Sequence, residues 1–356
     1  MLDSAILVRR QEPGFARNAL CYAGGLAAGL ALSVLLLVWA GVPPQAIVNE
    51  LVVEAFFTAD GIAQTTTAAI PLILVGVATV ITMRLQFWNI GIEGQLWLGA
   101  IAAAWIALGD VGPEATRLPL MLLAAFLAGA AWMALPLLLK LRWGVSEVIS
   151  TLLLGSVAFL LVQHLLFGVW RDPATGFPIS AAFDPAERFA PLGWGQLHAG
   201  LWVALAAGLL VWLLLDRTRL GFYAKAIGLN RTAARAAGMP VYRSIALLVL
   251  GAGGLCGLAG AVILAGTEHR LNQSVGVGYL FSGIVIAFLA RSSPLAAMLI
   301  AFVVGGVFTA GGVLKVFYSV SEAVVVLIQG TVLMTVLISH FFSAYRLTRP
   351  TWKTAP

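Results

Sequence analysis

Three polar side chains, Asn89, Glu93 and Gln95, stand in the otherwise apolar stretch FWNIGIEGQLWLGA. Placing an Asp, Lys or Arg at the centre of a membrane helix costs at least about 2.5–3.5 kcal/mol on insertion scales, so an ionisable group there is a candidate functional group. Amides and carboxylates form hydrogen bonds, which is the chemistry that conducts a polar solute along a path. On a helix, Asn89 and Glu93 would share a face, with Gln95 pointing elsewhere.

A structural interpretation of the same three residues stays open beside this one. Gly91 and Gly94 weaken a helix and allow close backbone approach, so the polar groups can instead hold together a broken segment. Gln329, in the last apolar run, can likewise face a path or bond a neighbouring helix. Glu147 and Glu322 each follow a serine, the pattern of a helix N-terminus, and are predicted to favour the helix dipole there.

Catalytic chemistry has no support in the sequence. It contains no HExxH, no GxSxG, no paired carboxylates and no Cys/His cluster with metal-ligand spacing. His164, the single histidine of its apolar run, is interpreted as a packed side chain. We therefore expect a protein that is not an enzyme and that has no metal site and no cofactor of its own.

The elements that must position these residues are membrane helices. Hydrophobic residues make up 61% of the 356 residues and charged residues 10%, against roughly 25% charged in a soluble domain, and the mean hydropathy is +0.98. A helix needs about 20 apolar residues to cross a bilayer. The apolar runs predict an all-α, polytopic bundle of ten transmembrane helices in a single membrane domain, 1–356, at 19–41, 62–83, 90–109, 118–139, 146–169, 199–216, 244–266, 276–290, 294–314 and 322–342.

The basic residues orient this bundle. With both termini in the cytoplasm, 16 of the 21 lysines and arginines fall on the cytoplasmic side and 5 on the other, as the positive-inside rule requires. The net charge of +6 is then a consequence of topology and not of nucleic-acid binding. GGLCG, at 253–257, contains a small-xxx-small pattern and predicts close helix packing.

Two gaps between the predicted spans are long. The outer one, 170–198, is rich in Pro, Gly and acids, and is either a solvated connection or a docking surface for an extracytoplasmic partner. The inner one, 217–243, holds six basic residues and no acid. Its stretch 223–237 is Ala-rich and is followed by Gly238 and Pro240, which predicts one short cytoplasmic helix. Its alanines permit close approach of a cytoplasmic partner.

Both unusual segments resemble a known family. FWNIGIEGQLWLGA is similar to the FNIG-x-EGQ segment, and LGFYAKAIGLNRTAARAAGM to the coupling segment, of permease subunits from ABC importers of the ribose, simple-sugar and nucleoside group, nucleoside-type branch. Further similar stretches lie in order along most of the chain: IPLILVGVA, SEVISTLLL, WRDPATGFPIS, GYLFSGIVIAFLARSSPL and IQG. The chain departs from the family pattern at Trp88, Lys225, Leu229 and Thr232.

The resemblance implies a multi-pass permease of the bacterial inner membrane that translocates nucleosides, with simple sugars as the alternative. It implies four kinds of partner: a second, related permease forming a heterodimer, a cytoplasmic ABC ATPase that binds ATP and Mg, an extracytoplasmic substrate-binding protein, and membrane lipid. In the coupling segment, it assigns contact with the ATPase to Lys225, Gly228, Asn230, Arg231, Ala233, Ala234 and Gly238. Asn89, Glu93, Gln95 and Gln329 are the candidates for the substrate path.

One independent observation agrees with a separate ATPase. A phosphate-binding Walker A loop needs a Gly-Lys pair, and none of the four lysines follows a glycine. The rival hypothesis is a proton-coupled secondary transporter working through Glu93, Glu147 or Glu322. Such carriers commonly contain inverted repeats, and the sequence has no convincing internal repeat.

Overall fold

The computed structural model describes residues 6–9, 15–318 and 321–348, and these form two compact units. One unit comprises Met1–Ile47 with Tyr318–Pro356, and the other comprises Val48–Phe317. The prediction of a single membrane domain over the whole chain stays a prediction.

The smaller unit is a pair of helices, α1 (Phe15–Trp39) and α14 (Glu322–Ala344), with α2 (Pro44–Val48) beginning in it. Small residues let the pair approach closely: a Cβ built on Gly25 would lie 2.5 Å from the Cβ of Ser339. β1 (Ile6–Arg9) pairs antiparallel with β2 (Tyr345–Thr348). This short ladder and an isolated bridge between Pro191 and His198 are the β interactions among the described residues.

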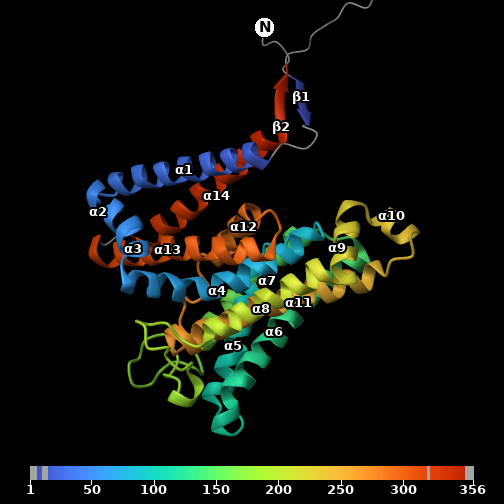
Figure 1. Ribbon diagram of the computed structural model, residues 1–356. Coiled ribbons are helices and arrows are strands. Elements are labelled where there is room, and N and C mark those ends of the chain that lie inside the picture. Colours follow the sequence, from blue (N-terminus) through green and yellow to red (C-terminus); the bar gives the residue numbers. More distant parts are fainter. Residues whose placement is uncertain (1–5, 10–14, 319–320, 349–356) are drawn as a thin grey trace, which may run out of the picture. The chain divides into compact units, whose positions relative to one another are not determined.

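The larger unit is helical throughout its regular structure (Figure 1). Its elements are η1 (Asn49–Glu54), α3 (Ala55–Phe57), α4 (Ala59–Arg84), α5 (Ile92–Leu108), α6 (Glu114–Trp143), α7 (Glu147–Phe167), η2 (Pro185–Glu187), α8 (Gly200–Arg217), α9 (Arg219–Leu229), α10 (Arg231–Ala236), α11 (Val241–Ile263), η3 (Leu264–Glu268), α12 (Tyr279–Leu289) and α13 (Pro294–Tyr318).

Helices α4 and α11 form the centre of this unit. In α4, 83% of the apolar window is buried and in α11 with η3 78%, whereas the corresponding share in α7 is 22%. Helix α11 packs on α5 and α6 at backbone distance, because a Cβ on Gly257 would lie 2.2 Å from the carbonyl oxygen of Ala125 and a Cβ on Gly99 would lie 2.1 Å from that of Gly257. The close packing predicted from GGLCG is confirmed.

Each of the ten predicted spans contains an apolar helix, but the helices differ in length. Within the described residues, six are long and apolar enough to cross a bilayer, namely α4, α6, α7, α8, α11 with η3, and α13. Of the remaining apolar helices, α5 has 17 residues and α12 has 11, and 11 residues make about 16 Å of helix. Ten full crossings and cytoplasmic termini therefore stay predictions.

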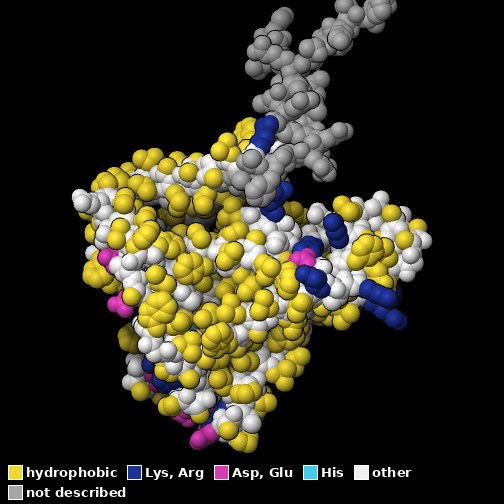
Figure 2. All heavy atoms as spheres, viewed as in Figure 1, with side chains coloured by type: hydrophobic (Ala, Val, Ile, Leu, Met, Phe, Trp, Pro, Cys, Tyr) yellow, Lys and Arg dark blue, Asp and Glu magenta, His cyan; other side chains and the backbone are white. Residues whose placement is uncertain are grey.

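Figure 2 shows hydrophobic side chains covering most of the visible face of the larger unit, with lysine and arginine side chains gathered over the end that carries α9 and α10. Large apolar side chains such as Trp202, Leu210 and Leu299 are exposed. Such an exterior suits lipid as the surrounding medium.

Candidate functional site

Asn89 and Gln95 form a closed amide pair. Helix α5 begins only at Ile92, so Asn89 lies in the non-helical segment before it and can fold back over the first turn. The Asn89 Nδ2 donates to Gln95 Oε1 and the Gln95 Nε2 donates to Asn89 Oδ1, each at 3.0 Å, and both side chains are buried. Asn89 Oδ1 also accepts the Gly91 N–H at 3.0 Å. The prediction that Asn89 and Glu93 share a helix face is wrong, because the helix starts after Asn89.

Glu93 points to a different helix. Its Oε1 accepts the backbone N–H groups of Gly278 at 3.1 Å and Leu280 at 3.3 Å, at the start of the short helix α12. The first N–H groups of a helix have no partner within that helix and carry its positive dipole end, so a carboxylate stabilises them. The path candidates thus have different partners. Glu93 bonds the start of α12, whereas Asn89 and Gln95 bond each other at the start of α5.

The remaining path candidate, Gln329, belongs to α14 in the smaller unit. Its side chain lies outside the described residues, as does that of Glu322.

The non-helical segment before α5 also forms hydrogen bonds with α7. The Ile90 N–H donates to Thr151 Oγ1 at 3.1 Å, and the Trp88 N–H donates to Glu147 Oε1 at 3.4 Å. The same Glu147 oxygen pairs with the Lys140 ammonium. Glu147 does lie in the first turn of α7, where its carboxylate also bonds its own backbone N–H in addition to these two groups of other segments.

The segment 217–243 contains two helices, α9 and α10, and not the single helix predicted over 223–237. Asn230 separates them, because its Oδ1 accepts the N–H groups of Thr232 and Ala233, both at 3.0 Å, and caps α10. The predicted stop is confirmed: Gly238 has a φ of +73° and its N–H bonds the Arg235 carbonyl at 3.0 Å.

Helix α9 packs directly on the end of α4. A Cβ on Gly228 would lie 2.0 Å from the Arg84 carbonyl oxygen, and Arg231 Nη2 donates to the Leu85 carbonyl at 3.4 Å. Ala234 is buried as well. These two small residues thus serve contacts inside the chain, whereas Lys225, Asn230, Ala233 and Gly238 are exposed.

A cavity of about 660 and one of about 590 Å³ lie at the two ends of α8. The smaller cavity, beside α9, is bordered by Gly228 and by polar side chains of several elements. These are Arg84, Gln86, Asp216, Lys225, Arg291 and Ser292. Two of the predicted coupling residues, Lys225 and Gly228, therefore share one cavity wall.

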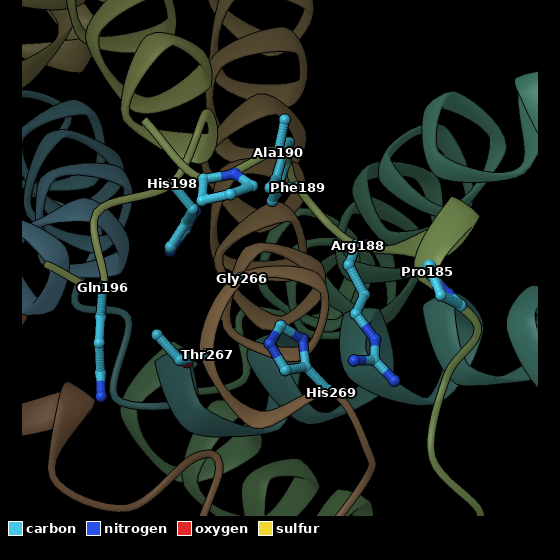
Figure 3. Close-up of a pocket in the computed structure, with 10 residues that line it drawn as sticks. Pro185, Arg188, Phe189, Ala190, Gln196, His198, Gly266, Thr267 and His269 are labelled. Atoms are coloured by element: carbon cyan, nitrogen blue, oxygen red, sulfur yellow. The ribbon is translucent and has the colours of Figure 1, made fainter. Parts of the chain in front are cut away.

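The larger cavity lies before the start of α8 (Figure 3). Arg188, His198 and His269 line it, and the His198 ring stacks on Phe189 with centroids 5.5 Å apart. Burial, together with a smaller effect of the nearby His269, lowers the pKa of His198 to about 4, so this imidazole is neutral at pH 7. Burial also lowers the pKa of His269. Sequence reasoning missed both histidines, since neither has a motif around it.

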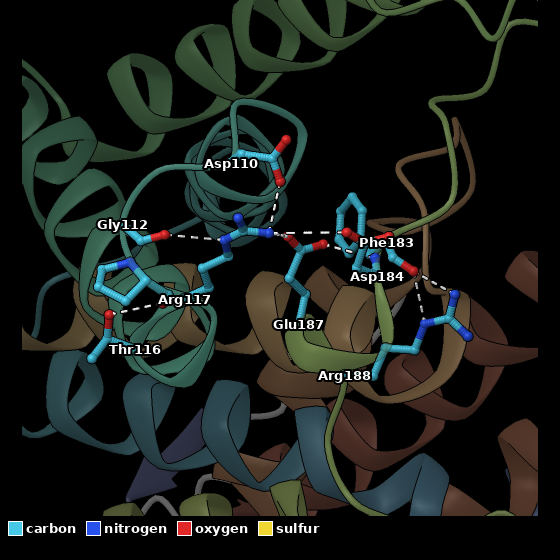
Figure 4. Close-up of polar contacts among 9 residues, drawn as sticks. Asp110, Gly112, Thr116, Arg117, Phe183, Asp184, Glu187 and Arg188 are labelled. Atoms are coloured by element: carbon cyan, nitrogen blue, oxygen red, sulfur yellow. Dashed lines mark hydrogen bonds and ion pairs between the residues drawn. The ribbon is translucent and has the colours of Figure 1, made fainter.

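The segment 170–198 is held to the helices and is not a loose connection. The Phe183 N–H bonds the His269 carbonyl at 2.8 Å, and the Ser180 N–H bonds that of Leu271 at 2.9 Å. Arg117 of α6 pairs with Asp110 at 2.6 Å and with the buried Glu187 at 3.3 Å (Figure 4).

The oxygens of Asp110, Asp184 and Glu187 lie close enough together to hold a cation, but the Arg117 guanidinium already supplies positive charge among them. No motif in the sequence predicted this cluster, because Arg117 and Glu187 are 70 positions apart.

Comparisons with known proteins match most of the chain. Residues 61–337 match the family model described as branched-chain amino acid transport system / permease component. A glucose ABC transporter permease protein of Haloferax volcanii is 35% identical over 90% of this chain and 87% of its own length. A guanosine ABC transporter permease protein of Bacillus subtilis is 33% identical over 74% and 75%. A nucleoside ABC transporter permease protein of Lactococcus lactis subsp. cremoris is 28% identical over 75% and 76%.

The resemblance noted in the sequence is thereby confirmed at the level of the family. The match covers the six long apolar helices apart from the first two residues of α4, and the relatives named above are permease proteins. The chain belongs to the branched-chain amino acid transport system permease family and is a multi-pass membrane permease of the ABC transporter type.

Proposed function

We propose that this chain is the transmembrane permease subunit of an ABC importer for nucleosides in a bacterial inner membrane. Energy comes from the hydrolysis of ATP, which separate ATPase subunits bind together with Mg. Both termini and the α9–α10 segment lie in the cytoplasm in this arrangement, and the segment 170–198 faces the extracytoplasmic binding protein. A second, related permease completes the path.

The observation that carries the coupling role is the contact between α9 and α4. Gly228 lies against the Arg84 carbonyl with no room for a Cβ, and α4 is the most deeply buried of the long apolar helices. A displacement of α9 would therefore act directly on α4, at the centre of the larger unit. The exposed residues Lys225, Asn230, Ala233 and Gly238 would touch the ATPase, while Gly228, Arg231 and Ala234 hold the segment on its own chain.

Among the candidate polar residues, we assign the path role according to the hydrogen bonds that each side chain already forms. Asn89 and Gln95 satisfy each other, so we assign them to shaping the start of α5. Glu93 borders the path, where its carboxylate can meet a sugar hydroxyl or a base edge while it holds α12. Gln329 stays a path candidate.

Nucleosides are proposed over sugars because the two motifs resemble the nucleoside-type branch and two relatives are named for guanosine and nucleosides. Simple sugars are the second candidate, favoured by the glucose permease protein that is 35% identical over 90% of this chain.

Purification of the chain from its host with its co-purifying proteins, followed by reconstitution into vesicles, tests both parts. We expect a P-loop ATPase and a second permease in the complex, and ATP-dependent nucleoside uptake that excess unlabelled nucleoside abolishes and excess glucose or ribose does not. Competition by sugars and not by nucleosides would indicate that the substrate is a sugar. Uptake driven by a proton gradient without ATP would contradict the importer.

A further inference from the structure

Arg84, the last residue of α4, uses its whole guanidinium group to join other elements. Nε donates to the Ser292 carbonyl at 2.9 Å, Nη1 to the Leu215 carbonyl at 3.0 Å, and Nη2 to Asp216 Oδ1 at 2.7 Å. Leu215 and Asp216 lie in the last turn of α8, and Ser292 lies in the turn between α12 and α13. One side chain thus joins the end of α4 to the end of α8 and to the turn between α12 and α13.

The backbone of the same residue carries the contact with α9. The Arg84 carbonyl is the atom that lies 2.0 Å from a Cβ built on Gly228, and the neighbouring Leu85 carbonyl accepts from Arg231. A displacement of α9 therefore acts on the backbone of Arg84. The Arg84 side chain then connects this point to the turn after α12.

The turn that Arg84 holds is conformationally strained. Arg291 has a φ of +49° and Ser292 a φ of +59°, two consecutive residues other than glycine in the left-handed region. Such conformations persist only where surrounding contacts enforce them, and they cluster at switch regions. The bond from Arg84 Nε to the Ser292 carbonyl is one of those contacts.

Helix α12 is held at its other end and along its length too. Glu93 of α5 bonds its first N–H groups, and a Cβ on Gly283 would lie 2.6 Å from the Val75 side chain of α4. The short helix therefore lies on α4 with both its ends tied to long helices. Movement of the α4 end relative to α5 would tilt α12.

We propose that Arg84 is a positioning residue that transmits movement of the α9–α10 segment to the turn between α12 and α13. The proposal rests on the proposed ABC importer function. Arginine suits the role because its planar fork reaches three acceptors at fixed angles, whereas a lysine ammonium is a single point on a flexible stem.

The test compares Arg84→Lys with the unmodified permease in the complete, reconstituted transporter. Assembly, ATP hydrolysis and substrate uptake are measured on the same vesicles, and the readout is substrate transported per ATP hydrolysed. We expect this ratio to fall by about tenfold, within the range by which residues along a coupling network modulate the coupling between two sites. Assembly and hydrolysis per complex should stay near normal.

A merely structural role would give a different result. Uptake and hydrolysis would then fall together, or the amount of complex would fall with an unchanged ratio, and either outcome overturns the proposal. Arg142→Lys, at the exposed end of α6, is the matched control and should leave the ratio unchanged.

If Arg84→Lys fails to assemble, Asp216→Asn decides the matter. It removes the ion pair at 2.7 Å but leaves the two bonds from Arg84 to backbone carbonyls available. A lowered ratio in this variant supports the proposal, and an unchanged ratio overturns it. Failure of the underlying function is distinguishable, because the unmodified complex would then show no ATP-dependent uptake at all.

Discussion

At the residue scale, the amide pair Asn89–Gln95 satisfies its own hydrogen bonds at the start of an apolar helix. Two amides facing each other satisfy a donor and an acceptor on each side chain, and Gln95 Nε2 also approaches Met133 Sδ at 3.2 Å. A buried amide without its partner would pay the desolvation cost of every unmade bond.

Replacing Gln95 with leucine should therefore lower stability and not act on transport specifically. The change leaves Asn89 Nδ2 buried without an acceptor, which costs about 1–3 kcal/mol. Thermal unfolding of the purified protein in detergent measures it. Gln64→Leu, at an exposed amide of α4, is the control. Equal stability of the two variants would show that the pair is dispensable.

Glu93 is the residue at which structural support and a path role can be separated. Glu93→Gln keeps an oxygen acceptor for the N–H groups of Gly278 and Leu280 but removes the charge, whereas Glu93→Leu removes both. We expect Glu93→Gln to assemble normally and to change the KM of uptake, and Glu93→Leu to reduce the amount of folded protein. Normal uptake by Glu93→Gln would limit the residue to holding α12.

At the scale of elements, the α9–α4 contact requires a residue without a side chain at Gly228. Gly228 has the Arg84 carbonyl where a Cβ would stand, and that obstacle is backbone, which cannot rotate away. An added side chain must move α9 as a whole.

Gly228→Leu should therefore release the ATPase while the permease stays inserted. Overpacking of this kind costs about 1–3 kcal/mol, and displacement of α9 disturbs the docking surface. The amount of ATPase that co-purifies with membrane-inserted permease is the measurement. Gly155→Leu, at a helical glycine with open space around its Cβ position, serves as the control and should retain the ATPase. Normal retention in Gly228→Leu would contradict the coupling assignment.

The connection between the segment 170–198 and the end of α11 contains a titrating group. His198 has a pKa of about 4 in the folded protein against 6.5 for an unperturbed histidine, so the unfolded chain binds more protons between these values. The contribution of His198 to folding stability is then fully present above about pH 6.5. It is lost as the pH falls toward 4 and amounts to about 3 kcal/mol at 1.36 kcal/mol per pKa unit.

His198→Asn should flatten this dependence. Asparagine can supply an acceptor in place of His198 Nδ1, which accepts the Gly200 N–H at 3.2 Å, but it does not titrate. Melting temperatures measured between pH 7 and 4 should fall less steeply in the variant. Parallel curves for the two proteins would show that this histidine is not the source.

At the scale of the whole molecule, the larger unit has one cavity at each end of α8. The cavity beside α9 lies at one end and the cavity lined by His198 and His269 at the other, and the 18 residues of α8 span about 27 Å between them. The exterior of the helices is apolar. In the proposed importer, the ATPase and the substrate-binding protein would bind at these two ends, away from the lipid-facing surface.

The sequence by itself determined the membrane class, the position of each apolar helix, the Gly238 stop and the family. These depend on local composition and on motifs that are contiguous in the chain. A run of about 20 apolar residues has one stable environment wherever it occurs, and a glycine followed by a proline ends a helix whatever packs beside it.

Only the tertiary structure decided what each polar residue bonds. Arg84 and Ser292 are 208 positions apart and Glu93 and Gly278 are 185 apart, and no periodicity relates them. The late start of α5 and the cap at Asn230 also escaped the pattern, because both depend on a side chain that turns back to bond nearby groups. Helix packing brings such groups together, since a buried polar atom must find its partner wherever the fold places one.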